Sequence, residues 1–527
     1  MNTISSQRSS FKQFLTVIAL SGFLLFCNAQ VRVRATSNSQ RKDTAQIDAY
    51  VQKEMQAAGI PGLAYGIVEG DQIVHLQAFG MADSTGRPVT PQTPFLIGSV
   101  GKNITALAIQ QLVQVGKVSL DMPVQTYIPW FRLADMEAAR QITLRQLLNH
   151  TSGISNGDGT NLDYYRSDRF TNEEIVRSLD QVKLDRPVGS SMEYSNLNYL
   201  ILGQVIAQVS GQTYDAYVQQ HILSPLEMQH TFMSLPEAQA DGLAQGHRIL
   251  FGFTTPTQLP YVRGIMSAGN HISTVEDMSH LLIANLNQGN YQGISVLTQD
   301  GKPSNEDQEK PFYDVHWIPW KTIPRNMTDA QSGGSLEYAG CIYLLPTFHI
   351  GVVVLTNANT AETFPTKSAQ TIAFDILEMY SGFSGRSTEM SIKTLYIGIN
   401  FLLLVGAGFL FYRVLGLRKW KQKMNRQYVK TRWNLLPTFL VDLGFPIVLL
   451  LGLPLLIRPL FAPGLSFEKT WPLITYTHPD LSYSIWAFSV VLLLVGVIKL
   501  IWLLKWAGSN DPERKILFNA FNSSDMQ

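Results

Sequence analysis

The stretch Phe95-Leu-Ile-Gly-Ser99-Val-Gly-Lys102 decides how this chain is interpreted, because it places a serine and a lysine three residues apart. Residues at this spacing lie on one face of a helix, so the Ser99 hydroxyl and the Lys102 amine can hydrogen-bond if a helix begins here. A serine hydroxyl becomes a good nucleophile when a nearby base takes its proton. A lysine serves as that base where burial or neighbouring positive charge lowers its pKa. The spacing alone is common, so its weight depends on the rest of the chain.

Apolar runs near both ends of residues 45–380 predict strands, and the segment between them carries helical patterns. The predicted strands are 64–68, 72–79, 341–344 and 350–355, and a helix is expected over 104–113. One antiparallel sheet assembled from both ends, flanked by helices and joined to an all-helical region, is an α+β arrangement.

A second motif, Tyr194-Ser195-Asn196, precedes a helical segment that begins near Tyr199. A phenol beside a lysine ammonium ionises more easily and relays a proton. The asparagine two residues later is able to orient that lysine or to hold a substrate carbonyl. Taken alone, such a loop is more often a helix-capping turn.

Together these pieces resemble the serine β-lactamase and penicillin-binding-protein superfamily, and within it the class C β-lactamase/peptidase S12 branch. The matching segments are 95–121, 142–153, 187–226 and 352–357, and the resemblance covers nearly all of 45–380. The resemblance implies that Ser99 attacks a carbonyl and forms an acyl-enzyme. It also implies that Lys102 and Tyr194 share the proton transfers and that Asn196 completes the site. His150 lies in a matching loop and is expected to support the site, not to act as its base.

The third motif of the family departs from its usual form here. The resemblance aligns Gln331-Ser332-Gly333-Gly334 with a motif that begins with lysine or histidine. It implies substrate contacts at Gln331 and Gly333 and an oxyanion hole made by the amides of Ser99 and Gly334. Gln331 lacks the positive charge that faces a substrate carboxylate, so efficient penicillin hydrolysis and removal of a charged C-terminal D-alanine are disfavoured. A neutral or polar amide is the expected substrate.

Composition excludes several other classes of function. The net charge is +1, which gives no electrostatic case for nucleic acid binding. The sequence contains no metal-binding cluster and no nucleotide-binding loop, so neither a metal nor another cofactor is expected. Of the two cysteines, Cys27 belongs to the N-terminal segment and Cys341 lies in an apolar run. Cys341 is therefore expected to be a buried structural thiol.

Residues 1–29 have the pattern of a secretory signal. Arg8 and Lys12 form a basic start, and the apolar run 14–26 is too short to span a bilayer. Small residues near Ala29 provide a cleavage site. An uncleaved anchor is the alternative, and a lipid attached at Cys27 is disfavoured by the bulky Phe26 that precedes it.

The C-terminal part, 394–527, is predicted to be a membrane domain that follows a linker at 381–393. Its three predicted spans are about 395–415, 435–457 and 484–504, each near the roughly 20 residues that a bilayer requires. The basic loop 418–432 is expected in the cytoplasm, which places the catalytic domain outside and the C-terminus inside.

Two ionisable residues, Asp442 and Lys499, fall at similar depths in the second and third predicted spans. Their depth allows them to pair. Lys499 is equally able to extend its amine to the interface, and for Asp442 pairing or a polar cavity is expected. Loop 458–483, between these spans, carries Trp471, Tyr476 and Tyr483 as expected interfacial anchors.

The expected function is a membrane-anchored, extracytoplasmic serine hydrolase, and first of all a peptidase or amidase. The domain order is similar to that of the prodrug-activating peptidases of nonribosomal peptide pathways, as in colibactin maturation. Those enzymes remove an N-terminal acylated D-asparagine cap. The expected partners are a small peptide or acylated amide substrate and membrane lipids, and the helices offer a surface for oligomerisation. The alternatives are an esterase, a weak β-lactamase, or a non-catalytic β-lactam sensor or scaffold. A scaffold is disfavoured because Ser99, Lys102 and Tyr194 are all present.

Overall fold

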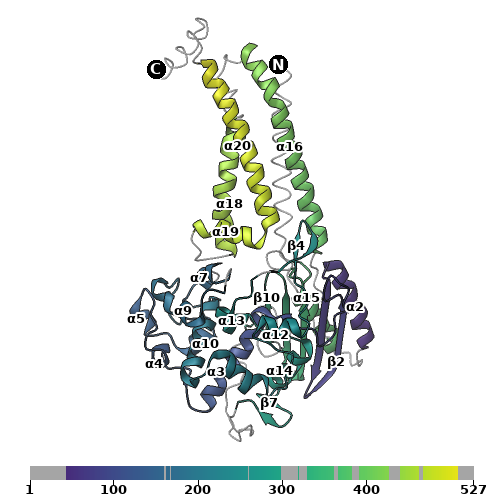
Figure 1. Cartoon of the computed structure of the whole chain (residues 1–527), viewed down its shortest axis with the longest axis vertical. Helices are drawn as coiled ribbons and strands as arrows, with labels where there is room; N and C mark the ends of the chain where they lie inside the picture. Colours follow the sequence, from purple (N-terminus) through teal and green to yellow (C-terminus); the bar gives the residue numbers. More distant parts are fainter. Residues whose placement is uncertain are drawn as a thin grey trace.

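The structure is a computed structural model that describes residues 43–159, 162–165, 168–258, 260–297, 318–319, 329–360, 366–382, 391–426, 439–461 and 467–507. Figure 1 shows an α+β domain at the base and a group of long helices above it. The predicted signal segment 1–29 and most of the predicted linker, 383–390, lie outside the described residues. The predicted domain boundaries therefore remain predictions.

One antiparallel sheet of six strands organises the domain, in the order β2-β1-β12-β11-β10-β9. Its strands are β1 (Gly62–Glu69), β2 (Gln72–Gly80), β9 (Ile318–Pro319), β10 (Asp329–Gly334), β11 (Ala339–Leu345) and β12 (Ile350–Thr356). Strand β1 pairs with β12, from Leu63 opposite Thr356 to Glu69 opposite Ile350. The prediction of a sheet assembled from both ends of the domain is confirmed.

The remaining elements of the domain are short strand pairs and helices. The pairs are β3 (Phe95–Leu96) with β6 (Ile272–Ser273), β4 (His247–Leu250) with β5 (Phe253–Pro256), and β7 (Asn290–Tyr291) with β8 (Ile294–Ser295). The α-helices are α2 (Thr44–Ala58), α3 (Lys102–Gln114), α4 (Val124–Tyr127), α5 (Met136–Ala139), α6 (Leu144–Leu148), α7 (Asn156–Gly159), α8 (Leu162–Tyr165), α9 (Asn172–Arg177), α10 (Asn196–Ser210), α11 (Tyr214–Val218), α12 (Leu235–Ala240), α13 (Met266–Gly269), α14 (Val275–Leu286) and α15 (Ala369–Ser381). The 3₁₀ turns are η1 (Gly98–Gly101), η2 (Ser178–Gln181), η4 (Arg263–Ile265) and η6 (Pro346–Phe348), and η3 (Gln219–Leu223) is a π-helical turn.

Helices cover both faces of the sheet, which explains why β11 and β12 are continuous apolar runs. On β12, Val353 and Leu355 face the larger core with α14 and the all-helical region. Val352 and Val354 alternate to the opposite face, where they pack with Cys341, α2 and α15. Cys341 is a free, buried thiol, as predicted, and burial raises its pKa.

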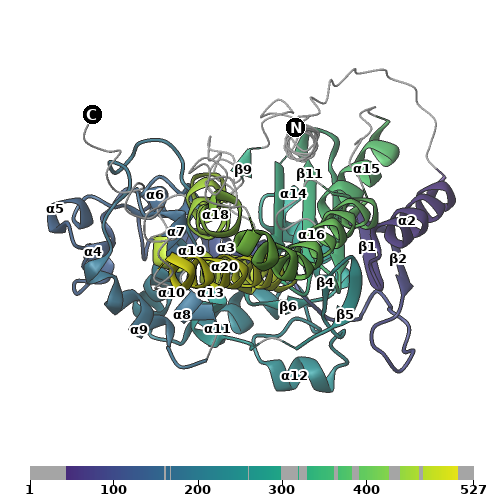
Figure 2. The same cartoon turned by 90° about the horizontal axis from the view of Figure 1, so that it is seen from above.

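The C-terminal region consists of helices that stand on the domain. They are α16 (Ile392–Arg426), α18 (Phe445–Phe461), α19 (Phe467–Thr477) and α20 (Pro479–Ala507), and the π-helical segment η8 (Leu440–Gly444) leads into α18. Figure 2, seen from above, shows α16, α18 and α20 side by side over the domain. Within the described residues, the predicted basic loop continues α16 as far as Arg426, and the predicted loop 458–483 contains α19.

Two of these helices, Ile392–Gln422 and Pro479–Lys505, are long and apolar enough to cross a membrane, whereas three were predicted. The apolar helix between them, Leu440–Leu456, is shorter. Side chains such as Phe401 and Leu404 on α16 are mostly exposed, at 62% and 72%. Exposed apolar surface of this extent marks a contact with lipid or with another protein.

A buried charge cluster joins α16, η8 and α20. The Lys499 ammonium donates to Asp442 Oδ2 at 2.6 Å, and the Arg413 guanidinium pairs with Asp442 Oδ1. Asp442 is completely buried and Lys499 is 3% exposed. The prediction that Asp442 and Lys499 pair is confirmed. Arg413 was missed because it lies near the end of the first predicted span, among residues expected to reach the interface.

We predict that Asp442→Asn destabilises the full-length protein, because the buried Lys499 and the partly buried Arg413 then lose their common partner. Breaking a buried ion pair costs about 3–5 kcal/mol, so the thermal unfolding midpoint in detergent should fall by several degrees. The triple variant Asp442→Leu, Arg413→Met, Lys499→Met removes all three charges and should recover most of the loss. The exposed pair Arg140–Glu137 provides the control: Glu137→Gln should leave the midpoint unchanged. Equal midpoints for Asp442→Asn and wild type would contradict the structural role of the cluster.

Candidate active site

Ser99 and Lys102 come together because a 3₁₀ turn leads directly into a helix. Ser99 lies in η1 and Lys102 is the first residue of α3. Their side chains meet with 3.0 Å between Lys102 Nζ and Ser99 Oγ. The contact anticipated from the spacing is therefore present, although the turn at Ser99 is 3₁₀ and not α-helical.

Tyr194 is the second partner of the serine. Its hydroxyl lies 2.6 Å from Ser99 Oγ, and it comes from the loop before α10. Burial raises the pKa of Tyr194 to about 12, although the hydrogen bond with Ser99 opposes the shift. The sequence-based expectation of an easily ionised phenol is not met, because burial of the phenol outweighs the hydrogen bond that would favour its ionisation. Tyr194 is therefore a proton donor in the resting site.

Lys102 is buried to 1% exposure, and its protons have fixed acceptors. Its amine donates to Asn196 Oδ1 at 2.7 Å and to the carbonyl oxygen of Ala268 on α13. Burial lowers the pKa of Lys102 well below that of a free lysine. Burial accounts for the direction of this change in the pKa of Lys102.

Lys102 Nζ has three oxygen neighbours, those of Asn196, Ala268 and Ser99, and an ammonium would donate one proton to each. Burial favours the neutral amine, which has two protons and one lone pair. In that form the oxygens of Asn196 and Ala268 accept the two protons, and the lone pair is left for the Ser99 hydroxyl. With Tyr194 donating to Ser99 Oγ, the protons are aligned from Tyr194 through Ser99 to Lys102. This alignment prepares the hydroxyl for attack on a carbonyl.

Hydrogen bonds on the side away from Lys102 fix the orientation of the Asn196 amide. Its nitrogen donates to Tyr165 Oη at 2.6 Å and to the carbonyl of Gly159 at 3.4 Å, so its oxygen must face Lys102. Tyr165 in turn donates to the carbonyl of Gly159 at 2.8 Å. Asn196 therefore positions the lysine, one of the two roles that the sequence left open.

His150 supports the loop that carries Tyr194. Its Nδ1 accepts from the Ser195 amide at 3.2 Å and contacts Asn198 Nδ2 at 3.1 Å, while its ring lies 4.5 Å from that of Tyr194. Burial is the main cause that lowers the pKa of His150 to about 3, and any positive charge on Lys102 acts in the same direction. These contacts hold a neutral ring against the Tyr194 loop and leave the Ser99 hydroxyl to Lys102 and Tyr194. His150 therefore has the supporting role expected of it.

Strand β10 approaches the serine so closely that only glycine fits at two positions. A methyl group on Gly98, where φ is +56°, would lie 2.3 Å from the Gly334 amide nitrogen. A methyl group on Gly333 would lie 2.3 Å from the Ser99 amide nitrogen. The two backbone segments therefore meet beside Ser99, where the amides of Ser99 and Gly334 were expected to form an oxyanion hole.

Gln331 lies behind the site, not in it. Its side chain is 3% exposed; Nε2 donates to the Ser99 carbonyl at 2.9 Å and Oε1 accepts from Asn103. Both ends of the amide are thus occupied by protein groups. The expected contact between Gln331 and substrate has no support in this geometry, because alternation along β10 turns the side chain into the core. Gln331 instead ties β10 to η1 and α3.

A cavity of about 460 Å³ opens next to Asn196 and Tyr165. Part of its wall comes from Gly334 and the segment after it, and part from Leu473, Tyr476 and Thr477 of α19. Among the described residues that line the cavity there is no lysine, arginine or histidine. The cavity therefore offers no cationic partner for a substrate carboxylate.

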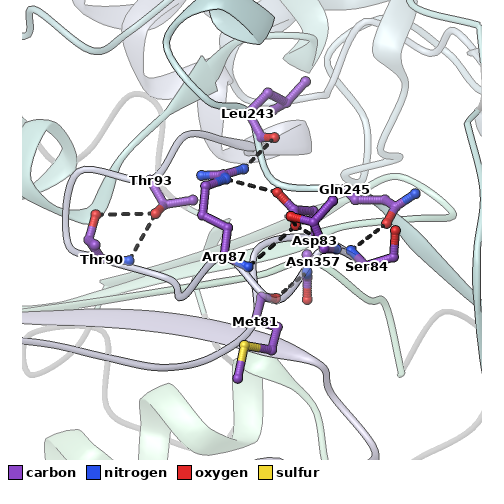
Figure 3. A network of polar contacts seen from close by, with 10 residues as sticks. Met81, Asp83, Ser84, Arg87, Thr90, Thr93, Leu243, Gln245 and Asn357 are labelled. Atoms are coloured by element: carbon purple, nitrogen blue, oxygen red, sulfur yellow. Dashed lines mark hydrogen bonds and ion pairs between the residues drawn. The ribbon is translucent and has the colours of Figure 1, made fainter.

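The cavity wall at 243–245 is held by a polar network, shown in Figure 3. The Arg87 guanidinium joins Asp83 at 2.8 Å and the Leu243 carbonyl at 3.3 Å. The Gln245 side chain accepts from the Ser84 amide at 3.1 Å. Asn357 at the end of β12 donates to the Met81 carbonyl at 3.1 Å, which fixes the same loop to the sheet.

Sequence reasoning missed three contributors to this site: Tyr165, the carbonyl of Ala268, and the α19 side of the cavity. A backbone carbonyl carries no residue signature, and Tyr165 lies in a short helix without a motif. The part of the chain that the structure describes has no group of three His, Cys, Asp or Glu side chains that could hold a metal ion.

Comparison with known families agrees with this geometry. The sequence matches the family profile described as Beta-lactamase over residues 47–374, well over half of the chain. The chain therefore belongs to the beta-lactamase family, whose fold is that of serine hydrolases related to penicillin-binding proteins.

The individual relatives share between 25% and 31% of their aligned residues with this chain. The chain is 27% identical over 328 residues to Protein flp of Staphylococcus aureus (strain MW2), an alignment that covers 62% of this chain and 65% of that protein. The alignment with Protein flp of strain MRSA252 is 25% identical over 470 residues and covers 88% and 92%. Penicillin-binding protein 4 of Amycolatopsis lactamdurans is 31% identical over 327 residues, which covers 58% of this chain and 83% of that protein.

Among solved structures, the octameric penicillin-binding protein homologue from Pyrococcus abyssi is similar. Its TM-score is 0.54 at 27% identity, and the match covers 64% of this chain and 78% of that chain.

We predict that the rate of Ser99 phosphonylation by an uncharged fluorophosphonate, in which Oγ attacks phosphorus and displaces fluoride, rises with pH as Lys102 loses its proton. Because burial lowers this pKa, the rise should be complete well below about pH 10.4, where a free lysine titrates. Lys102→Arg stays charged and should lose about 10²–10⁴ in rate at every pH. The measurement is the second-order labelling rate between about pH 5 and pH 10. If the labelling rate instead rose around pH 6.5, and this rise were absent in His150→Gln, His150 would be the base.

We predict that Gly98→Ala lowers the acylation rate by about 10²–10³, because its methyl group forces β10 away from the Ser99 amide. Gly86 provides a matched control, since its φ is +90° and a methyl group there meets nothing within 4 Å. Gly86→Ala therefore carries the same kind of backbone strain without the collision. Labelling rates and unfolding midpoints of the two variants should be compared. Equal labelling rates would contradict the close approach of β10.

Proposed function

We propose that this chain is a membrane-anchored, extracytoplasmic serine hydrolase that forms an acyl-enzyme at Ser99 and acts as a peptidase or amidase on an uncharged substrate. The observation that carries the proposal is the proton alignment from Tyr194 through Ser99 to the buried Lys102. Membership in the beta-lactamase family supports the reaction class. The Amycolatopsis relative is named as a penicillin-binding protein, and because penicillin is an amide the name supports an amide as the substrate class.

The reaction follows from the same contacts. Ser99 Oγ attacks the substrate carbonyl while its proton moves to the lone pair of Lys102. The negative oxygen of the tetrahedral intermediate faces the amides of Ser99 and Gly334. Tyr194 protonates the leaving nitrogen and is reprotonated by the Lys102 ammonium, whose Nζ lies 5.0 Å from the centroid of the Tyr194 ring. Water then attacks the acyl-enzyme with the same base, which restores the serine.

The charge at the site supports an uncharged substrate. Gln331 occupies the position of the family's usual cation and is committed to protein partners. Among the described residues, the cavity wall also lacks lysine, arginine and histidine. A substrate carboxylate would lose its hydration there without gaining a cationic partner, and it would lie in a cavity that Glu337 also lines.

Membrane anchoring is supported by the two long apolar helices and by their exposed side chains. We place a third crossing at η8 and α18, whose apolar stretch Leu440–Leu456 is shorter than the other two and about 26 Å long at 1.5 Å per residue. The basic end of α16, with Arg418, Lys419 and Lys421, supports a cytoplasmic location for that end and an extracytoplasmic catalytic domain. The long alignment with Protein flp of strain MRSA252 shows that the similarity is not restricted to the catalytic domain.

The decisive test is covalent labelling of the full-length protein in detergent with a fluorescent fluorophosphonate. Wild type should label, Ser99→Ala should not, and Tyr194→Phe should label about 10²-fold more slowly or worse. Ser195→Ala is a matched control, because this neighbouring hydroxyl is buried and has no hydrogen-bond partner in the described structure. Equal labelling of wild type and Ser99→Ala would refute the proposal.

Turnover then separates the alternatives. Steady release of product from uncharged amides, with slow hydrolysis of nitrocefin, is the expected result. Rapid nitrocefin hydrolysis would make the chain a β-lactamase. Stable labelling without turnover of any amide or ester would make it a sensor.

A further inference from the structure

Helix α19 is held against the catalytic domain by specific contacts. The Arg248 guanidinium on β4 donates to the carbonyls of Tyr476 and Thr477, the latter at 2.9 Å. These are carbonyls of the last turn of α19, where a helix has no internal donors and where positive charge is favoured. The Phe251 amide donates to Asp480 Oδ2 at 2.8 Å and fixes the start of α20 to the same hairpin.

The opposite side of α19 is packed against the other C-terminal helices. Trp471 donates to the Leu450 carbonyl at 2.7 Å, and its ring lies 5.5 Å from that of Trp486 on α20. Thr475 and Ser482 share a hydrogen bond of 2.7 Å. With both sides held, α19 presents a fixed surface to the cavity.

That surface reaches the active site. Leu473, Tyr476 and Thr477 line the same cavity as Asn196 and Tyr165. The pKa of Tyr165 is raised by burial and further by the neighbouring Tyr194 and Tyr476, which agrees with their proximity. The C-terminal helices thus supply part of the space in which substrate must lie.

Gly334 connects this cavity to the nucleophile. It lines the cavity together with Asn196, and it also lines a second cavity of about 260 Å³ that is lined by Ser99 and Gly333. Neither Ser99 nor Tyr194, the proton donor for the leaving nitrogen, lines the larger cavity. A substrate held at Ser99 with its carbonyl oxygen toward the Gly334 amide can therefore extend its acyl group past Gly334 into the larger cavity.

We propose that Leu473 and Tyr476 of α19 are specificity-determining residues, which select substrates by the length and bulk of an uncharged, apolar acyl group in this cavity. This rests on the proposed acyl-enzyme at Ser99. The sequence-based view of the C-terminal helices as an anchor is thereby extended, because one of them becomes a wall of the substrate site. Arg248 acts as a positioning residue, since it holds the end of α19 but does not line the cavity.

The test uses p-nitrophenyl esters from acetyl to dodecanoyl with the full-length protein in one detergent. For wild type, kcat/KM should rise about fourfold per methylene until the cavity is filled. Leu473→Trp fills the cavity and should end the rise at a shorter chain, whereas Leu473→Ala enlarges it and should extend the rise. Ile474→Trp is the matched control, because the adjacent residue is half-buried but does not line the cavity. Arg248→Met should flatten the chain-length profile, mainly through KM.

Fluorophosphonate labelling of Ser99 separates failure of this inference from failure of the proposed function. Opposite shifts of the optimum in the two Leu473 variants, with wild-type labelling and an unchanged optimum in Ile474→Trp, support the inference. An unchanged optimum in both Leu473 variants that still label would overturn the specificity role alone. A shift in Ile474→Trp equal to that in Leu473→Trp would also overturn it. Absence of labelling in wild type would refute the proposed function, and the inference with it.

Discussion

The burial of one amine is the constraint on which the rest of the site depends. Lys102 is 1% exposed. Its amine donates hydrogen bonds to two oxygens that can only accept, the side-chain oxygen of Asn196 and the backbone carbonyl oxygen of Ala268. An ammonium in this place would lack an anionic partner among the contacts described, so the neutral form is favoured. The chemistry follows directly: a neutral amine whose remaining lone pair points at a serine hydroxyl is a base already in position.

Holding that amine requires parts of the chain that are far apart in sequence. Residue 102 begins α3, residue 196 begins α10, and residue 268 lies in α13, while β10 closes the site from the sheet. Closing the sheet by pairing β1 with β12 brings both ends of the domain together, so that β10 lies against η1. The glycines at 98 and 333 permit this contact, and Gln331 secures it through Ser99 and Asn103. The fold and the nucleophile are thus coupled through backbone contacts.

The side chains that carry chemistry were predictable from the sequence, because Ser99, Lys102, Tyr194 and Asn196 sit in motifs with a chemical reason for their spacing. The strands at both ends were predictable from apolar runs. The direction in which the Gln331 side chain points was not predictable from the sequence, because alternation along a strand depends on a register that only the folded sheet defines. The same applies to the Ala268 carbonyl and to α19, whose residues have the pattern of a membrane-interface loop until their contact with β4 is known. Three membrane spans were predicted, but only two of the described helices are long and apolar enough to cross a membrane. The third predicted span corresponds to the shorter apolar helix Leu440–Leu456, which begins with the π-helical segment η8.

The missing cation at the third motif and the neutral lysine belong to one electrostatic arrangement. A substrate carboxylate close to Lys102 would favour the ammonium and raise the pKa of the lysine. The base would then be protonated at neutral pH unless another cation screened the carboxylate. At the position where the family usually provides that cation, this chain has Gln331, an uncharged side chain turned into the core. The described cavity wall contains no cationic side chain that could replace it. In the proposed reaction an uncharged substrate leaves the pKa of Lys102 unaltered, so the residue proposed to activate Ser99 would also restrict which molecules Ser99 can attack.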